Sequence, residues 1–112
     1  MVDSPSPSAL VVSSNSLLAY TRERILEAEG FEVTSVMTSN FNEDDFRERN
    51  FTVLVFGHSV AGPDKTRIAK IVHCGCIIEL FTNTPTISEA KHCEALDPWK
   101  LATTLRELAA GK

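Results

Sequence analysis

Short apolar runs alternate along the chain with longer segments in which apolar residues recur at helical spacing. The apolar runs predict five strands, at residues 9–12, 31–37, 51–56, 77–82 and 92–95. Helical periodicity and helix-start signals predict four helices, at residues 17–29, 41–49, 63–72 and from 97 onward. The run at 51–56 is almost continuously apolar, which is typical of a strand covered on both faces.

The ends of the predicted helices carry local signals. Gly30 supplies a left-handed stop after the first helix, and Pro63 opens the third. Asp97 and Pro98 suit the N-cap and the first turn of the last helix. Residues 41–49 run from acidic to basic, which matches the dipole of a helix. These signals support the alternation of strands and helices.

This alternation implies a parallel sheet with helices on both faces. Crossovers between parallel strands are right-handed, so the chain winds doubly around the sheet. In such a sheet the ligand crevice lies beyond the carboxyl ends of the strands, where the strand order reverses. The residues that follow the first, third and fourth strands are therefore candidates: Ser13, Ser14, Asn15, Gly57, His58, Phe81, Thr82 and Asn83.

Length, charge and cysteine content restrict the class of protein. The 112 residues fit one domain, which we place at residues 9–110 after a flexible leader at 1–8. A net charge of −4 argues against nucleic acid or a membrane surface as the direct partner. The apolar runs are shorter than a membrane span, the N-terminus lacks a secretory signal, and the three cysteines have no framework spacing. We therefore expect a cytoplasmic protein.

Several phrases of the sequence together resemble one known family. They are residues 25–34, Ile-Leu-Glu-Ala-Glu-Gly-Phe-Glu-Val-Thr, and residues 97–108, Asp-Pro-Trp-Lys-Leu-Ala-Thr-Thr-Leu-Arg-Glu-Leu. With the order of strands and helices, they make the chain similar to a CheY-like receiver domain of the response regulators over about residues 8–110. The resemblance implies two-component signalling. It also implies a doubly wound α/β sandwich with a five-stranded parallel sheet in the order 2-1-3-4-5.

The resemblance further implies where phosphorylation chemistry would lie, and the residues there do not suit it. The family holds magnesium with acidic residues after the first strand and with the aspartate that accepts the phosphoryl group. In this chain Ser13 and Ser14 take the acidic positions, and Gly57 takes the acceptor position. Because hydroxyls replace carboxylates poorly around a hard cation, we expect no magnesium and no other cofactor.

Two further family positions are altered. The switch threonine or serine falls on Phe81 or Thr82, and the phosphate-binding lysine falls on Glu94. An acid at the lysine position would repel a phosphoryl group. We therefore expect a degenerate receiver that is not phosphorylated on aspartate. We interpret His58 as a polar loop residue, since the sequence supplies no cations for a phosphohistidine.

The link between the fourth and fifth predicted strands is short for a receiver. Only residues 83–91 remain for it, and they include Pro85. A typical helix has about 11 to 12 residues, so we expect the fourth helix of the family to be shortened or absent. An exposed apolar flank would recruit a protein partner or a second copy of the chain. The candidate interface residues are Ile77, Leu80, Cys93 and Trp99.

Cysteines and histidines gather near the starts of the fourth and fifth predicted strands. They are His73, Cys74, Cys76, His92 and Cys93, and two neighbouring strands would place them in one region. Such ligands suit zinc or another thiophilic metal, although Cys-x-Cys is tighter than a standard zinc finger. Cysteine is also commonly buried. Packing, metal binding and a redox role stay open, and packing is favoured.

Two function classes follow. The favoured one is a non-catalytic regulatory module that acts through protein contacts or dimerisation and needs no phosphorylation. The alternative is a small-molecule site in the neutral crevice of Ser13, Ser14, Gly57 and Thr82, or a metal site at the Cys and His residues. An enzyme is not expected, because the sequence offers no nucleophile with a matching base and no acid pair. The charged residues of the helices, Arg22 and Lys65 among them, are interpreted as facing solvent.

Overall fold

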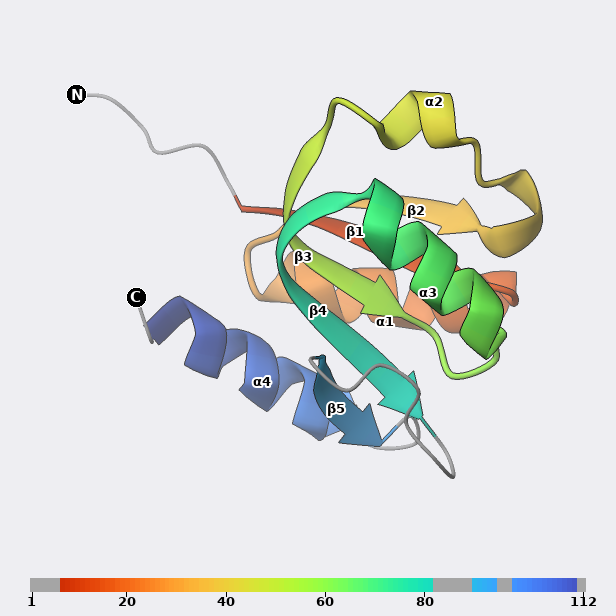
Figure 1. Ribbon diagram of the computed structural model, residues 1–112. Coiled ribbons are helices and arrows are strands. Elements are labelled where there is room, and N and C mark those ends of the chain that lie inside the picture. Colours follow the sequence, from red (N-terminus) through yellow and green to blue (C-terminus); the bar gives the residue numbers. More distant parts are fainter. Residues whose placement is uncertain (1–6, 82–89, 95–97, 111–112) are drawn as a thin grey trace.

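The computed structural model describes residues 7–81, 90–94 and 98–110, and strands and helices alternate in it through residue 81 (Figure 1). The strands are β1 Ser8–Ser13, β2 Glu32–Met37, β3 Asn50–Phe56, β4 His73–Phe81 and β5 Lys91–Glu94. The helices are α1 Ser16–Ala28, α2 Glu43–Phe46, α3 Gly62–Ile71 and α4 Pro98–Ala110, with a short 3₁₀ turn, η1, at Thr38–Asn40.

The strands form one parallel sheet in the order β2-β1-β3-β4-β5. Figure 1 shows α3 on the near side of the sheet and α1 on the far side. The predicted doubly wound architecture and strand order are confirmed. Because β1 and β3 are neighbours at the centre of the sheet, the chain leaves them in opposite directions, and the switch point of the topology lies between their carboxyl ends.

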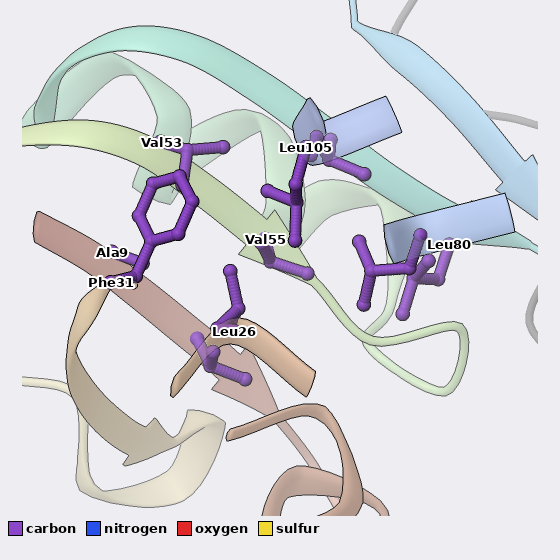
Figure 2. Packing of buried hydrophobic residues seen from close by; sticks show 10 residues of the cluster. Ala9, Leu26, Phe31, Val53, Val55, Leu80 and Leu105 are labelled. Atoms are coloured by element: carbon purple, nitrogen blue, oxygen red, sulfur yellow. The ribbon is translucent and has the colours of Figure 1, made fainter. Parts of the chain in front are cut away.

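One core cluster lies between the sheet and the helices α1 and α4. Leu26 of α1 and Leu105 of α4 pack with Ala9, Val55 and Leu80 of the strands, as Figure 2 shows. All five side chains are at most 2% exposed. This cluster positions α1, and so it also positions the residues that α1 presents at the carboxyl edge of the sheet.

The opposite face of the sheet is covered by α2 and α3. Ile68 of α3 and Phe46 of α2 pack with Leu10, Leu54 and Phe56 of the central strands. Residues of β3 are therefore buried on both faces of the sheet. This confirms the prediction from the continuous apolar run at 51–56.

Gly30 ends the first helix as predicted. Its φ of 91° is the left-handed value that glycine adopts without strain. The N–H of Gly30 donates to the carbonyl of Glu27 at 3.0 Å, and the N–H of Phe31 donates to the carbonyl of Leu26 at 3.0 Å. These two bonds satisfy the last carbonyls of the helix before the chain turns into β2.

Two predicted elements have different bounds in the structure. The helix expected at 41–49 is the single turn α2, because the side chain of Asn42 accepts a hydrogen bond from the N–H of Asp44 and starts the helix at Glu43. The fourth strand begins at His73 rather than residue 77, because its pairing with β3 already starts opposite Asn50. The predicted shortening of the helix before β5 and the Asp97 cap concern residues 82–89 and 95–97, outside the described residues.

An irregularity near Gly75 explains why the start of β4 lacks a clear strand pattern. Cys74 packs with the cluster under α3, whereas Cys76 packs with the cluster under α1 and α4. Regular alternation would put residues two apart on the same face. A Cβ on Gly75 would lie 3.1 Å from the carbonyl oxygen of Thr52, so the two strands approach closely at this point.

Candidate functional site at the carboxyl edge of the sheet

The central strands β1 and β3 end side by side at Ser13 and Gly57. The N–H of Gly57 donates to the carbonyl of Val12 at 2.9 Å, which extends the pairing of the two strands to their ends. Ser13 is fully buried, and its Oγ both donates to the carbonyl of Asn15 at 2.9 Å and accepts from the Asn15 N–H at 3.1 Å. The Asn15 Oδ1 in turn accepts from the N–H of Leu17 at 3.0 Å. The turn after β1 is thus a network of neutral groups that starts α1.

The loops after β1, β2 and β3 meet at this edge. The hydroxyls of Ser14 and Ser59 are hydrogen-bonded to each other across two of the loops. The Thr38 hydroxyl donates to the carbonyl of Ser13 at 3.3 Å, which joins the loop after β2. Ser13 and Ser14, which the resemblance puts at the acidic positions, are therefore engaged with neighbouring polar groups rather than arranged as metal ligands.

Arg22 of α1 lies over Gly57. Its side chain was expected to face solvent, but it is only 4% exposed, so that interpretation is wrong. A Cβ on Gly57 would lie 3.1 Å from Arg22 Nη1 and 3.4 Å from Ser13 Oγ. Gly57 has no positive φ, so the backbone does not require glycine there. The guanidinium and the Ser13 hydroxyl therefore leave little room for a side chain at position 57.

The guanidinium of Arg22 has one protein partner among the residues that the structure describes. Its Nη2 lies 3.1 Å from Nδ1 of His58, and its Nη1 is buried without a hydrogen bond. Burial lowers the pKa of Arg22, but arginine remains charged. Because the guanidinium can only donate, Nδ1 of His58 accepts, and the imidazole is neutral in this arrangement.

The pKa of His58 is held below its usual value of 6.5. Burial is the first cause, and the positive charges of Arg22 and Lys65 add to it. His58 therefore acts at this edge as a neutral acceptor for Arg22.

Lys65 and Glu79 form a buried ion pair beside the edge. Nζ of Lys65 on α3 lies 2.7 Å from Oε2 of Glu79 on β4, and the two side chains are 4% and 0% exposed. The expectation that Lys65 faces solvent is therefore wrong. A buried charge needs a partner of opposite charge, so each of these residues makes the burial of the other possible. The pair leaves Arg22 as the buried cation without a carboxylate partner in the described part of the chain.

Helical phase is the signal by which both buried cations can be found in the sequence. Arg22 stands three residues after Ala19 and four before Leu26, and all three are buried. Lys65 stands in the same way three residues before Ile68. Glu79 gives a further signal, since a carboxylate within an apolar strand requires a buried partner.

The remaining predicted positions of the phosphorylation site are only partly described. Thr82 lies outside the described residues. Glu94 ends β5 opposite Phe81 of β4, so its backbone lies at the carboxyl edge of the sheet. Within 7–81, 90–94 and 98–110, no group of three or more Cys, His, Asp or Glu residues is arranged to hold a metal ion.

The proposed cluster of cysteines and histidines is not assembled. His92 pairs with Glu79 and Cys93 with Leu80, whereas His73 lies opposite Asn50 at the start of β4. His73 lies six residues of strand before the level of His92, roughly 20 Å away, and Cys76 lies three residues before it, roughly 10 Å away. The prediction that these cysteines and histidines lie together at one end of the sheet is therefore wrong. β5 pairs only with the second half of β4, so its first residues lie well beyond the start of β4.

Cys74 and Cys76 are also separated from each other by the sheet. They pack with different clusters on its two faces, and both are free thiols. Burial is the first cause that raises the pKa of each thiol. A raised pKa disfavours the thiolate that metal binding and redox chemistry require. Ordinary packing describes these two cysteines.

The predicted interface residues have different environments. Leu80 is 2% exposed and belongs to the core under α4, so it is not available to a partner and that prediction is wrong. Ile77 is partly buried against the cluster under α3. Trp99 is 74% exposed on the first turn of α4. The side chain of Cys93 lies outside what the structure describes.

Solved structures share this fold. A CheY-like response regulator receiver domain from Methylobacillus flagellatus has a TM-score of 0.73 at 16% identity, over 93% of this chain and 99% of that chain. The chemotaxis response regulator CheY4 of Vibrio cholerae has a TM-score of 0.69 at 13% identity, over 93% and 99%. A CheY-like receiver domain protein from Methanospirillum hungatei JF-1 has a TM-score of 0.59 at 13% identity, over 96% and 100%. The chain therefore has a CheY-like receiver fold.

Sequence comparison adds no closer relative, since no family model and no curated protein matches the chain. Among the helices that the structure describes, none combines the length and the apolar character needed to cross a membrane.

Proposed function

We propose that this chain is a non-catalytic signalling module that uses a receiver fold, acts through protein contacts, and needs no phosphorylation of an aspartate. The Arg22 guanidinium beside Gly57 carries the proposal. At the position after β3 where the family that this chain resembles has its acceptor, there is no side chain, and a buried cation occupies the space. The acceptor position is thus filled by a group of opposite charge and opposite chemistry.

A cation at this position opposes magnesium. The guanidinium and a divalent ion would repel each other in a poorly hydrated site, where Coulomb interactions are strong. Ser13 and Ser14 supply hydroxyls, which are already hydrogen-bonded, in place of carboxylates. Phosphoryl transfer at this edge would therefore lack its metal as well as its acceptor.

Protein contacts are assigned to a groove between α1 and α4. The groove has a volume of about 290 Å³ and is lined by Ile25, Ala28, Glu29, Trp99, Ala102 and Arg106. An exposed tryptophan beside an apolar groove has the character of an interface anchor. Arg106 and Glu29 form an exposed ion pair at 3.0 Å within the lining, which gives the groove a polar rim. The occupant is a protein partner or a second copy of the chain.

A cytoplasmic site of action fits the chemistry of the cysteines. Cys74 and Cys76 are free thiols, as expected in a reducing compartment.

Titration with Mg²⁺, followed by beryllofluoride, tests the absence of the phosphorylation site. The isotope-labelled protein is followed through the amide cross-peaks of Ser13, Ser14 and Gly57, and an active receiver domain serves as the positive control. We expect no saturable shift at these three cross-peaks, because no carboxylate is available to bind the metal. A saturable shift confined to them would refute the proposal.

A further inference from the structure

One side of β4 is paired along only part of its length. The strand runs from His73 to Phe81, and β5 pairs with it from Ile78 to Phe81, beside its end in Figure 1. Among the described residues, no strand pairs with 73–77 on the side away from β3. On that side the N–H and C=O groups of alternate residues point away from the sheet. The first half of β4 is therefore an open edge.

The exposure of β4 changes where its pairing with β5 begins. Ile78, Glu79 and Leu80 are at most 2% exposed, whereas none of the residues 73–77 is buried. A groove with a volume of about 770 Å³ lies along this stretch, and we call it the β4 groove. Its lining includes all of 73–77, the end of α3, the start of β3 and Lys91. The open edge is thus accessible from solvent.

The β4 groove carries positive charge. Lys70 in the last turn of α3 and Lys91 at the start of β5 are both exposed and line it, together with His73. None of the described residues that line it is Asp or Glu. Because the whole chain has a net charge of −4, the groove differs in sign from the average of the molecule. Its charge favours an acidic ligand.

The β4 groove also offers apolar contacts. Ala69, Cys74 and Ile77 line it and are partly buried against the core cluster under α3. Successive side chains of a strand point to opposite faces of a sheet, so every second side chain of an added strand would reach these residues. Small or β-branched side chains suit such a half-buried position.

We propose that the open edge of β4 binds an extended acidic peptide of a partner protein, which adds a strand to the sheet in line with β5. A strand advances by roughly 3.3 Å per residue, so about five residues fill the stretch before β5 begins. Backbone hydrogen bonds to β4 supply the affinity in this mode of recognition, and alternate side chains supply the specificity. Lys70 and Lys91 select acidic residues at the two ends of the peptide.

A second copy of the chain suits the open edge less well than an acidic peptide. In a two-fold symmetric pair the same surface meets itself, so Lys70 and Lys91 of both copies would lie in one interface. Like charges placed opposite each other destabilise paired strands, and lysines beside an edge prevent association between edges. An acidic peptide turns the same charges into attraction.

Synthetic peptides test the site by nuclear magnetic resonance of the isotope-labelled protein. The probe is acetyl-Glu-Val-Thr-Val-Glu-amide, which has a β-branched centre and an acid at each end. The same peptide with lysine in place of both glutamates reverses the charge on an equal backbone. Two further forms of the probe are N-methylated, one at its second and fourth residues and the other at its third and fifth. Only one of these two sets of amides can face β4.

We expect the probe to shift the amide cross-peaks of residues 73–77 saturably and to slow hydrogen exchange of the outward-pointing amides among them. One N-methylated form should keep binding, and the other should lose it. Lys70→Glu and Lys91→Glu should each weaken binding by at least about fivefold. Lys100→Glu is the matched control, because it makes the same change of charge at an exposed position of α4 outside the groove lining, and it should bind like the wild type.

Four results would overturn the site. They are the absence of a saturable shift, equal binding of the two N-methylated forms, equal binding of the lysine peptide, and slow exchange of every amide of 73–77 in the free protein. Slow exchange that appears only at high protein concentration, with a rise in mass by light scattering, would assign the edge to a second copy and so overturn a peptide site. Each of these failures leaves Arg22 beside Gly57 and the groove between α1 and α4 unchanged, so it is distinguishable from failure of the proposed function.

Discussion

At the scale of single residues, Arg22 and His58 give the carboxyl edge its charge. The arginine needs an acceptor, and the neutral imidazole supplies one to Nη2. Protonation of His58 would remove that acceptor and place two cations side by side. The charged groups that act on His58 are Arg22 from α1 and Lys65 from α3, the latter balanced by Glu79 from β4. The edge is therefore sensitive to mild acid.

The pH dependence of stability follows from the lowered pKa of His58. In the unfolded chain His58 titrates near its ordinary value of 6.5, and in the folded chain it titrates below that value. Between the two pKa values the unfolded state binds more protons, so the free energy of unfolding rises with pH in this window. The contribution of neutral His58 to the free energy of unfolding should be fully present above about pH 6.5. It should be lost as the pH falls through the folded-state pKa of His58.

Urea unfolding of the wild type, His58→Asn and His73→Asn across mildly acid pH measures this effect. Asparagine at position 58 keeps an acceptor close to the place of Nδ1 but does not titrate, so the variant should lose that part of the pH dependence. His73 is exposed at the start of β4, opposite Asn50, and its substitution controls for the removal of a histidine elsewhere in the fold. If the free energy of unfolding changed with pH equally in the wild type and in His58→Asn, the assigned role of His58 would be contradicted.

At the scale of elements, helical phase places the two buried cations. Arg22 shares the inward stripe of α1 with Ala19 and Leu26, and Lys65 shares that of α3 with Ile68. Interpreting these residues by charge alone puts them in solvent, whereas their spacing from apolar residues puts them inside. The carboxyl edge then receives one cation from each face of the sheet. Lys65 is neutralised there by Glu79, whereas Arg22 has no carboxylate partner among the residues that the structure describes.

Breaking the ion pair of Lys65 should be costly. Lys65→Met leaves Glu79 as a buried charge without its lysine, and we expect the free energy of unfolding to fall by about 3–5 kcal/mol. The double variant Lys65→Met with Glu79→Gln carries neither charge and should recover most of that loss. Denaturant unfolding measures both variants.

Arg67→Met is the matched control for that measurement. Arg67 belongs to the same helix, and its pair with Asp64 is longer, at 3.5 Å, and more exposed. Its removal should change stability by less than about 1 kcal/mol. A Lys65→Met protein as stable as Arg67→Met would show that the buried pair contributes little.

The apolar pattern predicts the central elements because burial alone determines them. The strand at 51–56 is covered by helices on both faces, and the stop at Gly30 needs only a left-handed residue. The start of β4 is not predictable in this way, since Gly75 interrupts the alternation of faces. The register between β5 and β4 is set by pairing of β5 with Ile78 through Phe81. No local sequence pattern encodes this register. For that reason the sequence predicts a shorter distance between the two groups of Cys and His residues than the structure has.

At the scale of the whole molecule, the receiver fold is complete in its described layers while its edge chemistry is altered. The sheet, its strand order and both core clusters match what a receiver fold requires. The carboxyl edge carries a buried arginine and serines, and the groove between α1 and α4 carries an exposed tryptophan. These features together favour a protein that acts through contacts at its surface rather than through phosphorylation.

Contact through the groove should depend on Trp99. Trp99→Ala removes the exposed aromatic side chain, and we expect at least about a tenfold weaker self-association or partner binding, as for an interface anchor. Tyr20→Ala is the control, because Tyr20 is 59% exposed on α1 but does not line the groove. Light scattering over a range of concentrations, with crosslinking in extract, measures both variants. Equal association of the two variants would remove the groove from the interface.

Intact-mass measurement after incubation with acetyl phosphate and Mg²⁺ tests the central claim most directly. Gly57 offers no acceptor, and Nη1 of Arg22 lies within 3.1 Å of the position that a Cβ there would take. We predict an unchanged mass for this chain under conditions in which an active receiver domain gains one phosphoryl group. A gain of one phosphoryl group that is labile in base, as an acyl phosphate is, would contradict the account.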